Sequence, residues 1–319
     1  MSRRRRKKLP AEPVELTIGD LSHDGRGVAT HGEKRVFVRG ALPGERVLVR
    51  LTASKRRYDE GEVTGIVEAS TDRIEPRCPH FGTCGGCSLQ HLDSARQIEY
   101  KHNTLMQNLT RIGKVAPVAW WEPLSGPAWG YRRKARLSVR HVRRKERVLV
   151  GFRETYGRFV ADMQECHVLD PRVAAQLPQL SALILAMEAR EAIPQIEVAC
   201  GDDACALVFR HLEEICAGDL QMLREFAQAS GLAVLLQPGG PESIHPLQPE
   251  TVDLSFRLPA FGLEASSRGN SRLKQGNSLV VRRQRRQLSK SQWIAHFAQM
   301  RSLHCLSIDW IVFELCDDG

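Results

Sequence analysis

Three cysteines in one ten-residue loop constrain this chain more than any other feature. They are Cys78, Cys84 and Cys87, arranged as Cys-x5-Cys-x2-Cys around Gly85 and Gly86. Glycine has no Cβ and allows backbone angles that other residues avoid, so such a loop can aim several thiolates at one point. A fourth ligand has to come from elsewhere, and Cys166 is the best candidate. Four thiolates suit a structural zinc or an iron–sulfur cluster, so the pattern predicts one of these centres.

The other cysteines lack ligand-like spacing. In a reducing compartment, nine cysteines are expected to be thiols, metal ligands or core residues rather than a disulfide framework. We interpret four of them as core fillers: Cys200, Cys205, Cys216 and Cys305. Cys316, near an acidic terminus, carries no information.

Length and charge bound the class of protein. A chain of 319 residues is long enough for about two domains. The basic start is followed by prolines rather than by an apolar stretch, and apolar runs are far shorter than a membrane span, so we expect a cytoplasmic protein without a membrane segment. The net charge of +9 favours a polyanionic partner, and nucleic acid is the natural candidate. We expect a monomer.

Composition divides the chain into four parts. Residues 1–10 form a basic tail that should be disordered. Residues 11–70 contain short β-like runs at 14–18, 36–38, 46–51 and 62–67, separated by turn signals, which predict a small OB-like β-barrel. Residues 74–264 form a central α+β domain that carries the cysteine loop. From residue 265 to 319 the earlier periodicity is lost, and this tail does not continue the same domain. The predicted fold class is therefore α+β.

A helix and a basic hairpin follow the cysteine loop. Apolar residues recur at helical spacing over 93–112, with Asp93 as the expected cap and Gly113 as the stop. Residues 132–142 and 147–152 alternate apolar and basic residues, which predicts a hairpin with one wet face. The candidate phosphate contacts on it are Arg132, Arg133, Lys134, Arg136 and Arg140, with Arg143 and Arg144 in the turn. A solvated hairpin without a ligand is the alternative. Nearby aromatic residues, Trp129, Tyr131 and Phe152, could stack unpaired bases or pack in the core.

The remaining central domain has recognisable elements. We expect a helix over 173–190, a hairpin across residues 201–203, a helix over 219–230 ended by Gly231, and strands at 232–236 and 252–258.

Three stretches together resemble one family. The first, residues 21–29 (LSHDGRGVA), is similar to the opening hairpin of a TRAM barrel. The second, residues 78–90 with 97–101, is similar to an iron–sulfur loop and the helix that follows it. The third, residues 130–136 (GYRRKAR), is similar to a basic strand. The chain thus resembles the bacterial RNA uracil-C5 methyltransferases of the type that modifies a uridine of 23S ribosomal RNA. The resemblance implies that Cys78, Cys84, Cys87 and Cys166 ligate a [4Fe–4S] cluster, that ribosomal RNA is the partner, and that S-adenosylmethionine is the methyl donor of full-length members.

The resemblance covers residues 11–264 and then stops. Family members continue from a strand like that at 261–264 (FGLE) into a Rossmann-like domain with a glycine-rich cofactor loop, a catalytic cysteine and a base. Methylation at C5 of uracil needs a thiolate to add at C6 and a base to remove the C5 proton. We assign no catalytic and no S-adenosylmethionine-binding residue here. The expectation is a truncated or frame-shifted member that is inactive in this form.

Two other readings stay open. One is a stand-alone RNA-binding module that uses only the barrel and the hairpin. The other is a protein that is stabilised by a structural zinc or that resembles a ferredoxin. In a zinc site, His80 or His167 could replace a thiolate ligand.

Overall fold

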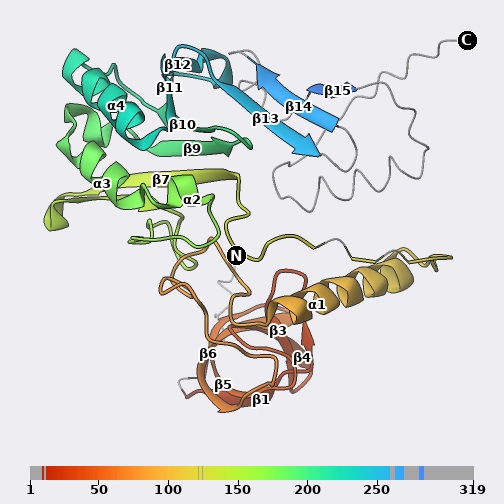
Figure 1. The fold of residues 1–319 in the computed structure, drawn as a ribbon. Helices are drawn as coiled ribbons and strands as arrows, with labels where there is room; N and C mark the ends of the chain where they lie inside the picture. The colour runs from red at the N-terminus through yellow and green to blue at the C-terminus, as the bar shows by residue number, and fades with distance from the viewer. Residues whose placement is uncertain are drawn as a thin grey trace, which may run out of the picture. The chain divides into compact units, whose positions relative to one another are not determined.

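The computed structural model describes residues 9–10, 12–120, 122–123, 125–258, 263–268 and 280–283. The chain divides into two compact units, Met1–Pro123 and Leu124–Gly319, which are described one at a time (Figure 1). Most of the predicted tail at 1–10 and most of the predicted tail at 265–319, including Cys305 and Cys316, lie outside the described residues.

The first unit contains a closed β-barrel. Its strands are β1 (Val14–Thr17), β2 (Asp20–Leu21), β3 (Gly27–His31), β4 (Lys34–Arg39), β5 (Arg46–Ser54) and β6 (Tyr58–Glu68). They pair in the order β1-β5-β6-β4-β3-β2. Because β1 and β2 are consecutive parts of one segment, that segment pairs with β5 at one end and with β3 at the other, which closes the sheet. The predicted small barrel is confirmed.

The barrel interior is filled by small and branched apolar side chains. Alternate residues of β5 point inward, as its exposed–buried pattern shows, and this is the period of two expected for a half-buried strand. The core residues are Leu16, Ile18, Ala29, Val36, Val38, Ala41, Val47, Val49 and Leu51. Gly61 lies close to this core, since an added Cβ would stand 2.5 Å from Cγ1 of Val49.

A capped helix follows the cysteine loop. Helix α1 (Ser94–Gln107) begins after Asp93, whose Oδ1 accepts hydrogen bonds from the N–H groups of Ala95 (3.0 Å) and Arg96 (3.3 Å). It continues as a π-helical turn, η1 (Asn108–Ile112), and ends at Gly113. The helix and both of its ends are confirmed as predicted. Its apolar side chains are largely exposed, and no residue of α1 is buried.

The second unit is built on a six-stranded mixed sheet. Its strands are β7 (Lys134–Val142), β8 (Arg147–Gly151), β9 (Gln195–Cys200), β10 (Cys205–Arg210), β11 (Ala233–Gln237) and β12 (His245–Gln248), in the order β12-β11-β10-β9-β7-β8. Strands β10 and β11 are parallel, and α4 (Ala217–Ser230) connects them, as a parallel pair requires. The predicted hairpin 132–152 is confirmed as the β7–β8 pair.

Helices cover one face of this sheet. Helices α3 (Leu177–Ala186) and α4 lie on the same side (Figure 1), and their buried residues include Leu180, Ile184 and Leu223. A second cluster, with Val208, Leu235 and Leu254, also forms a core against the sheet. Strands β10 and β11 therefore consist almost entirely of buried residues, as expected of strands covered on both faces.

Some predicted elements differ in detail. The helix expected over 173–190 is broken into α2 (Pro171–Ala174), α3 and a 3-10 turn, η3 (Glu188–Glu191). The helix over 219–230 is confirmed, with Gly231 in the left-handed conformation after it. Strand β12 and the short turns η2 (Arg143–Lys145) and η4 (Pro241–Ser243) were not predicted.

A third sheet contains β13 (Asp253–Leu258), β14 (Leu263–Arg268) and β15 (Val280–Arg283), all antiparallel. Strand β14 runs across residue 265, where the change in composition was noted. No helix in the described part of the chain is long and apolar enough to cross a bilayer.

Candidate nucleic-acid interface and cysteine sites

The cysteine loop of the first unit is held by short-range backbone hydrogen bonds. The N–H of Phe81 donates to the carbonyl of Cys78 (3.0 Å), and the N–H of Cys84 donates to that of His80 (2.8 Å). Gly82 supplies a left-handed turn between them, with φ of +88°. The N–H of Cys78 donates to Oε1 of Gln90 at 3.1 Å, which ties the loop to the residues before α1.

The loop also turns a backbone donor toward sulfur. The N–H of Gly86 lies 3.4 Å from Sγ of Cys84. Hydrogen bonds to sulfur are one of the ways in which proteins tune iron–sulfur clusters. Cys78 and Cys84 are buried, and Cys87 is half-buried. The loop therefore offers three thiols, two of them buried, together with an N–H group that favours negative charge on sulfur.

Cys166 lies in the second unit, beside the segment that leads into the basic strand. Next to it, the N–H of Gly130 donates to the carbonyl of His167 (2.9 Å), and the N–H of Arg132 donates to that of Val168 (2.7 Å). Cys166 is buried. The loop belongs to one unit and Cys166 to the other, so the four-cysteine ligand set remains a prediction.

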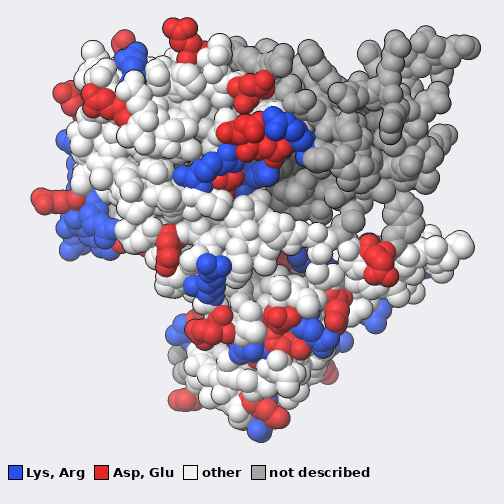
Figure 2. Space-filling view, in the orientation of Figure 1, with Lys and Arg blue, Asp and Glu red and all other residues white. Residues whose placement is uncertain are grey.

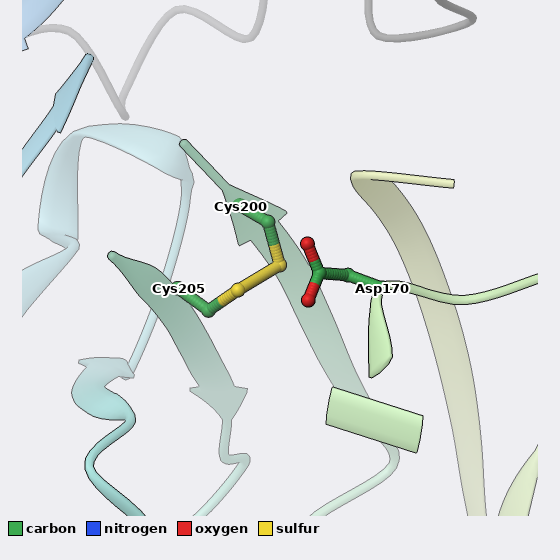
Figure 3. A group of neighbouring side chains, drawn as sticks. All are labelled: Asp170, Cys200 and Cys205. Atoms are coloured by element: carbon green, nitrogen blue, oxygen red, sulfur yellow. A yellow bond between two sulfur atoms is a disulfide. The ribbon is translucent and has the colours of Figure 1, made fainter. Parts of the chain in front are cut away.

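The prediction for Cys200 and Cys205 is wrong. We expected separate core fillers, but the structure joins them in a disulfide across the β9–β10 hairpin (Figure 3). The two residues face each other in register, with Cα atoms 4.0 Å apart, and a four-residue turn connects their strands. Spacing along the sequence does not reveal this pairing, because it depends on the hairpin register.

The carboxylate of Asp170 points at this disulfide (Figure 3). Asp170 is nevertheless engaged with Arg172, whose Nε and Nη2 donate to it at 2.9 and 2.8 Å. Burial raises the pKa of Asp170, but the hydrogen bonds and charge of Arg172 outweigh this effect and lower it below the ordinary value. With the sulfurs bonded to each other and the carboxylate bonded to Arg172, this group is not a free ligand set.

Cys216 is also not a core residue, contrary to our expectation. It is exposed and occupies the N-cap position of α4, where its Sγ accepts from the N–H of Asp219 at 3.5 Å.

Strand β7 carries the predicted basic face. Because side chains alternate along a strand, Lys134, Arg136 and Arg140 share one face, while Leu137 and Val139 are buried on the other. Arg136 is 71% exposed and pairs with Glu197 (2.9 Å). Arg140 is exposed and has no ion pair within the described residues. The solvent-exposed basic face expected of this hairpin is confirmed, and its role in binding RNA stays a prediction.

Arg132 and Arg133 lie in different surroundings from the other three. Arg133 forms an ion pair with Asp202 in the β9–β10 turn, and its guanidinium stands 5.5 Å from the ring of Phe256. Arg132 lies over two rings, 5.2 Å from that of Phe152 and 6.0 Å from that of Tyr131. Both arginines are half-buried, so they have less access to a phosphate than the exposed residues of β7.

The surface charge is mixed rather than uniformly positive. Figure 2 shows basic and acidic side chains beside one another on the visible face. The ion pairs agree: Arg143 pairs with Glu191, and Arg147 pairs with Asp162 at 3.0 Å. The net charge of +9 thus includes many arginines with acidic partners, which sequence alone does not identify.

Comparison with known proteins gives a consistent set of relatives. Residues 7–64 match the TRAM domain family. The chain is 50% identical over 268 residues to the 23S rRNA (uracil(1939)-C(5))-methyltransferase RlmD of Xanthomonas campestris pv. campestris (strain 8004), covering 83% of this chain and 60% of that protein. The RlmD of Alkalilimnicola ehrlichii is 50% identical over 267 residues, with the same coverage of both proteins.

A solved structure shares the fold. The tRNA (uracil-54, C5)-methyltransferase of Pyrococcus abyssi, determined in complex with S-adenosyl-L-homocysteine, matches 70% of this chain and 50% of that chain, with a TM-score of 0.50 and 20% sequence identity. The chain spans about 60% of the length of the curated relatives that it matches.

Proposed function

We propose that this chain belongs with the RlmD-type uracil-C5 methyltransferases over the residues that it shares with them. We propose that it supplies the ribosomal-RNA-binding part of a protein family that forms 5-methyluridine with S-adenosylmethionine. The observation that carries the proposal is the 50% identity over 268 residues, which extends far beyond the TRAM domain at 7–64. Such a match has to include much of the second unit, where the basic strand lies.

The proposed RNA surface is the wet face of β7. Lys134, Arg136 and Arg140 recur at every second or fourth residue, so their side chains follow one line along the strand. Each phosphate contact releases condensed counterions, which makes affinity fall as salt rises. Because Arg136 already pairs with Glu197 and Arg140 has no ion pair in the described region, Arg140 should contribute more to RNA affinity.

We propose that a [4Fe–4S] cluster is held by Cys78, Cys84, Cys87 and Cys166. The loop geometry supports this, since its backbone N–H at Gly86 approaches the sulfur of Cys84. Four-thiolate coordination would supply folding free energy by linking residues far apart in sequence, so its role here would be structural. Zinc on the same thiols is the second candidate, and the absence of visible absorption and of bound sulfide would identify it.

We propose that the 319 residues bind RNA without transferring methyl groups. Methyl transfer to C5 of uracil needs a thiolate that adds at C6, a base that removes the C5 proton and a binding site for S-adenosylmethionine. We assign none of these roles to a residue of this chain. We propose the cytoplasm as its location and a monomer as its state.

One experiment tests the function. Protein purified without oxygen is incubated with a 23S rRNA fragment containing the uridine modified by the relatives, together with radiolabelled S-adenosylmethionine. We expect salt-sensitive RNA binding and no labelled RNA. Failure to bind at low salt would refute the RNA-binding proposal, and labelled RNA would refute the assignment of the chain as non-catalytic. A full-length RlmD serves as the positive control.

A further inference from the structure

A small hairpin projects from the end of β8 in the second unit. The N–H of Ala161 donates to the carbonyl of Phe152, and the N–H of Glu154 donates to that of Phe159, both at 2.9 Å. Arg153 and Val160 form the bridge between its two sides. Residues 152–161, which we name the aromatic hairpin, therefore fold back on themselves with a tip at residues 155–158.

The foot and the tip of this hairpin differ sharply in exposure. At the foot, Val160 is 8% exposed and Ala161 is 1% exposed, so this end is packed in the unit. Toward the tip, Tyr156 is 54% exposed and Phe159 is 70% exposed. The packed foot anchors the backbone that carries the two rings, and more than half of each of these residues is exposed to solvent.

Residues 152–161 carry two arginines and one carboxylate, that of Glu154, whose backbone pairs with Phe159. Arg153 and Arg158 are both exposed, and neither has an ion pair among the described residues. At the foot, the guanidinium of Arg132 stands 5.2 Å from the ring of Phe152. Aromatic rings among arginines are the composition of single-stranded nucleic-acid sites, where bases stack on rings and phosphates meet cations.

We propose that Tyr156 and Phe159 form a stacking site for unpaired RNA bases, with Arg153 and Arg158 as neighbouring phosphate contacts. The proposal rests on the proposed function, because it specifies how the chain would recognise single-stranded segments of its RNA. A base inside a duplex already stacks on its neighbours, so only an unpaired nucleotide can use these rings. The site adds to the basic face of β7, which contacts backbone rather than bases.

The test compares four variants of the whole chain: Tyr156→Ala, Phe159→Ala, the double variant and Phe159→Trp. Leu212→Ala is the matched control, since Leu212 is 63% exposed and lies elsewhere in the second unit. Binding to a labelled single-stranded RNA and to a duplex of equal length is measured by fluorescence anisotropy at several salt concentrations. Thermal unfolding of each variant checks that the fold is intact.

We expect the double variant to bind single-stranded RNA at least about tenfold more weakly, the usual scale for losing base–aromatic stacking. The slope of log affinity against log salt should not change, because no charge is removed. Phe159→Trp should keep the affinity, and Leu212→Ala should behave as wild type. A 2-aminopurine in the RNA should lose less fluorescence on binding to the double variant than on binding to wild type.

Equal affinities of the wild type and the double variant for single-stranded RNA would overturn this proposal and leave the proposed function standing. An equal loss on duplex RNA would also overturn it, because stacking requires an unpaired base. If wild-type protein binds neither RNA, the proposed function itself fails, and the stacking site fails with it.

Discussion

The carboxylate of Glu45 is completely buried and accepts two hydrogen bonds from the guanidinium of Arg73, from Nε at 2.5 Å and from Nη2 at 2.8 Å. The N–H of Leu42 donates to the same carboxylate at 2.8 Å. Arg73 also donates to the carbonyl of Gly40 at 2.7 Å. The pair therefore joins the barrel to the segment that leads to the cysteine loop, and both belong to the first unit.

Removing Arg73 should destabilise this barrel strongly. Arg73→Ala leaves the charge of Glu45 buried without its partner, a change that typically costs about 3–5 kcal/mol. Faster hydrogen exchange of the β4 and β5 amides would report the loss. Arg46→Ala is the control: Arg46 pairs with Glu15 on the surface, and such pairs contribute about 1 kcal/mol or less. Equal exchange in the two variants would contradict this role of Arg73.

Acid should weaken the first unit in two stages. Burial, with the charge of Arg73 as a lesser cause, lowers the pKa of His91 to about 4. The folded state therefore keeps His91 neutral, while the unfolded chain takes up a proton below about pH 6.5. Stability should fall between about pH 6.5 and 4, by up to about 3 kcal/mol.

The second stage comes from Glu45. Burial raises its pKa, but the hydrogen bonds from Arg73 and Leu42 outweigh this effect and lower it below the ordinary value. Its contribution is therefore present above the unfolded pKa and is lost as pH falls through the folded one. Thermal unfolding at a series of pH values checks both stages. His91→Leu should flatten the first stage, whereas His23→Leu, at an exposed position, should leave it unchanged. A wild-type stability that is constant from pH 7 to about 4 would refute the first stage, and one that does not fall further as the pH is lowered below 4.5 would refute the second.

The cluster ligands make a prediction for metal content. Protein isolated without oxygen should contain iron and inorganic sulfide near four of each per chain, with visible absorption. Each single substitution by serine in the ligand set should lower the iron content severely. The four positions are Cys78, Cys84, Cys87 and Cys166. Cys216→Ser, at an exposed cysteine outside the set, should leave it unchanged. Full iron in Cys166→Ser would remove that residue from the ligand set, and zinc without sulfide would replace the cluster.

The cross-strand disulfide should protect two cysteines from alkylation. Under denaturing conditions without reductant, Cys200 and Cys205 should remain unlabelled by iodoacetamide, while Cys216 is labelled. Reduction should expose both thiols and cost roughly 2 kcal/mol of stability, the chain-entropy value for so short a loop. Mass spectrometry of peptides reads the labelling. Complete labelling of Cys200 before reduction would show that the pair is not oxidised in the isolated protein.

Local patterns predicted the elements whose determinants lie within a few residues. Helix α1 begins after its cap Asp93, and its continuation η1 ends at Gly113, both as expected, because capping is a short-range interaction. The β7–β8 hairpin followed from alternation across a polar turn. Closure of the barrel was predicted from strand spacing, although the shared use of one segment by β5 and β3 was not.

Features that depend on register and packing could not be read from the sequence. The pairing of Cys200 with Cys205 requires knowing which residues of β9 and β10 face each other. Likewise, Arg133 seemed equivalent to its neighbours in sequence, yet its partner Asp202 lies 69 positions away. The exposure of Phe159 depends on the turn at residues 155–158, and the glycine in that turn, Gly157, does not indicate which neighbouring side chains face solvent.

The salt dependence of RNA binding tests the central claim most directly. Affinity for the 23S rRNA fragment is measured from low to moderate salt for wild type, Arg140→Ala, Arg136→Ala and the control Arg224→Ala on α4. The account predicts a linear fall of log affinity with log salt, a slope reduced by about 0.7–1 in Arg140→Ala, and a smaller change in Arg136→Ala. Salt-independent binding, or a slope in Arg140→Ala that equals that of the wild type, would contradict the assignment of β7 as the RNA-binding face.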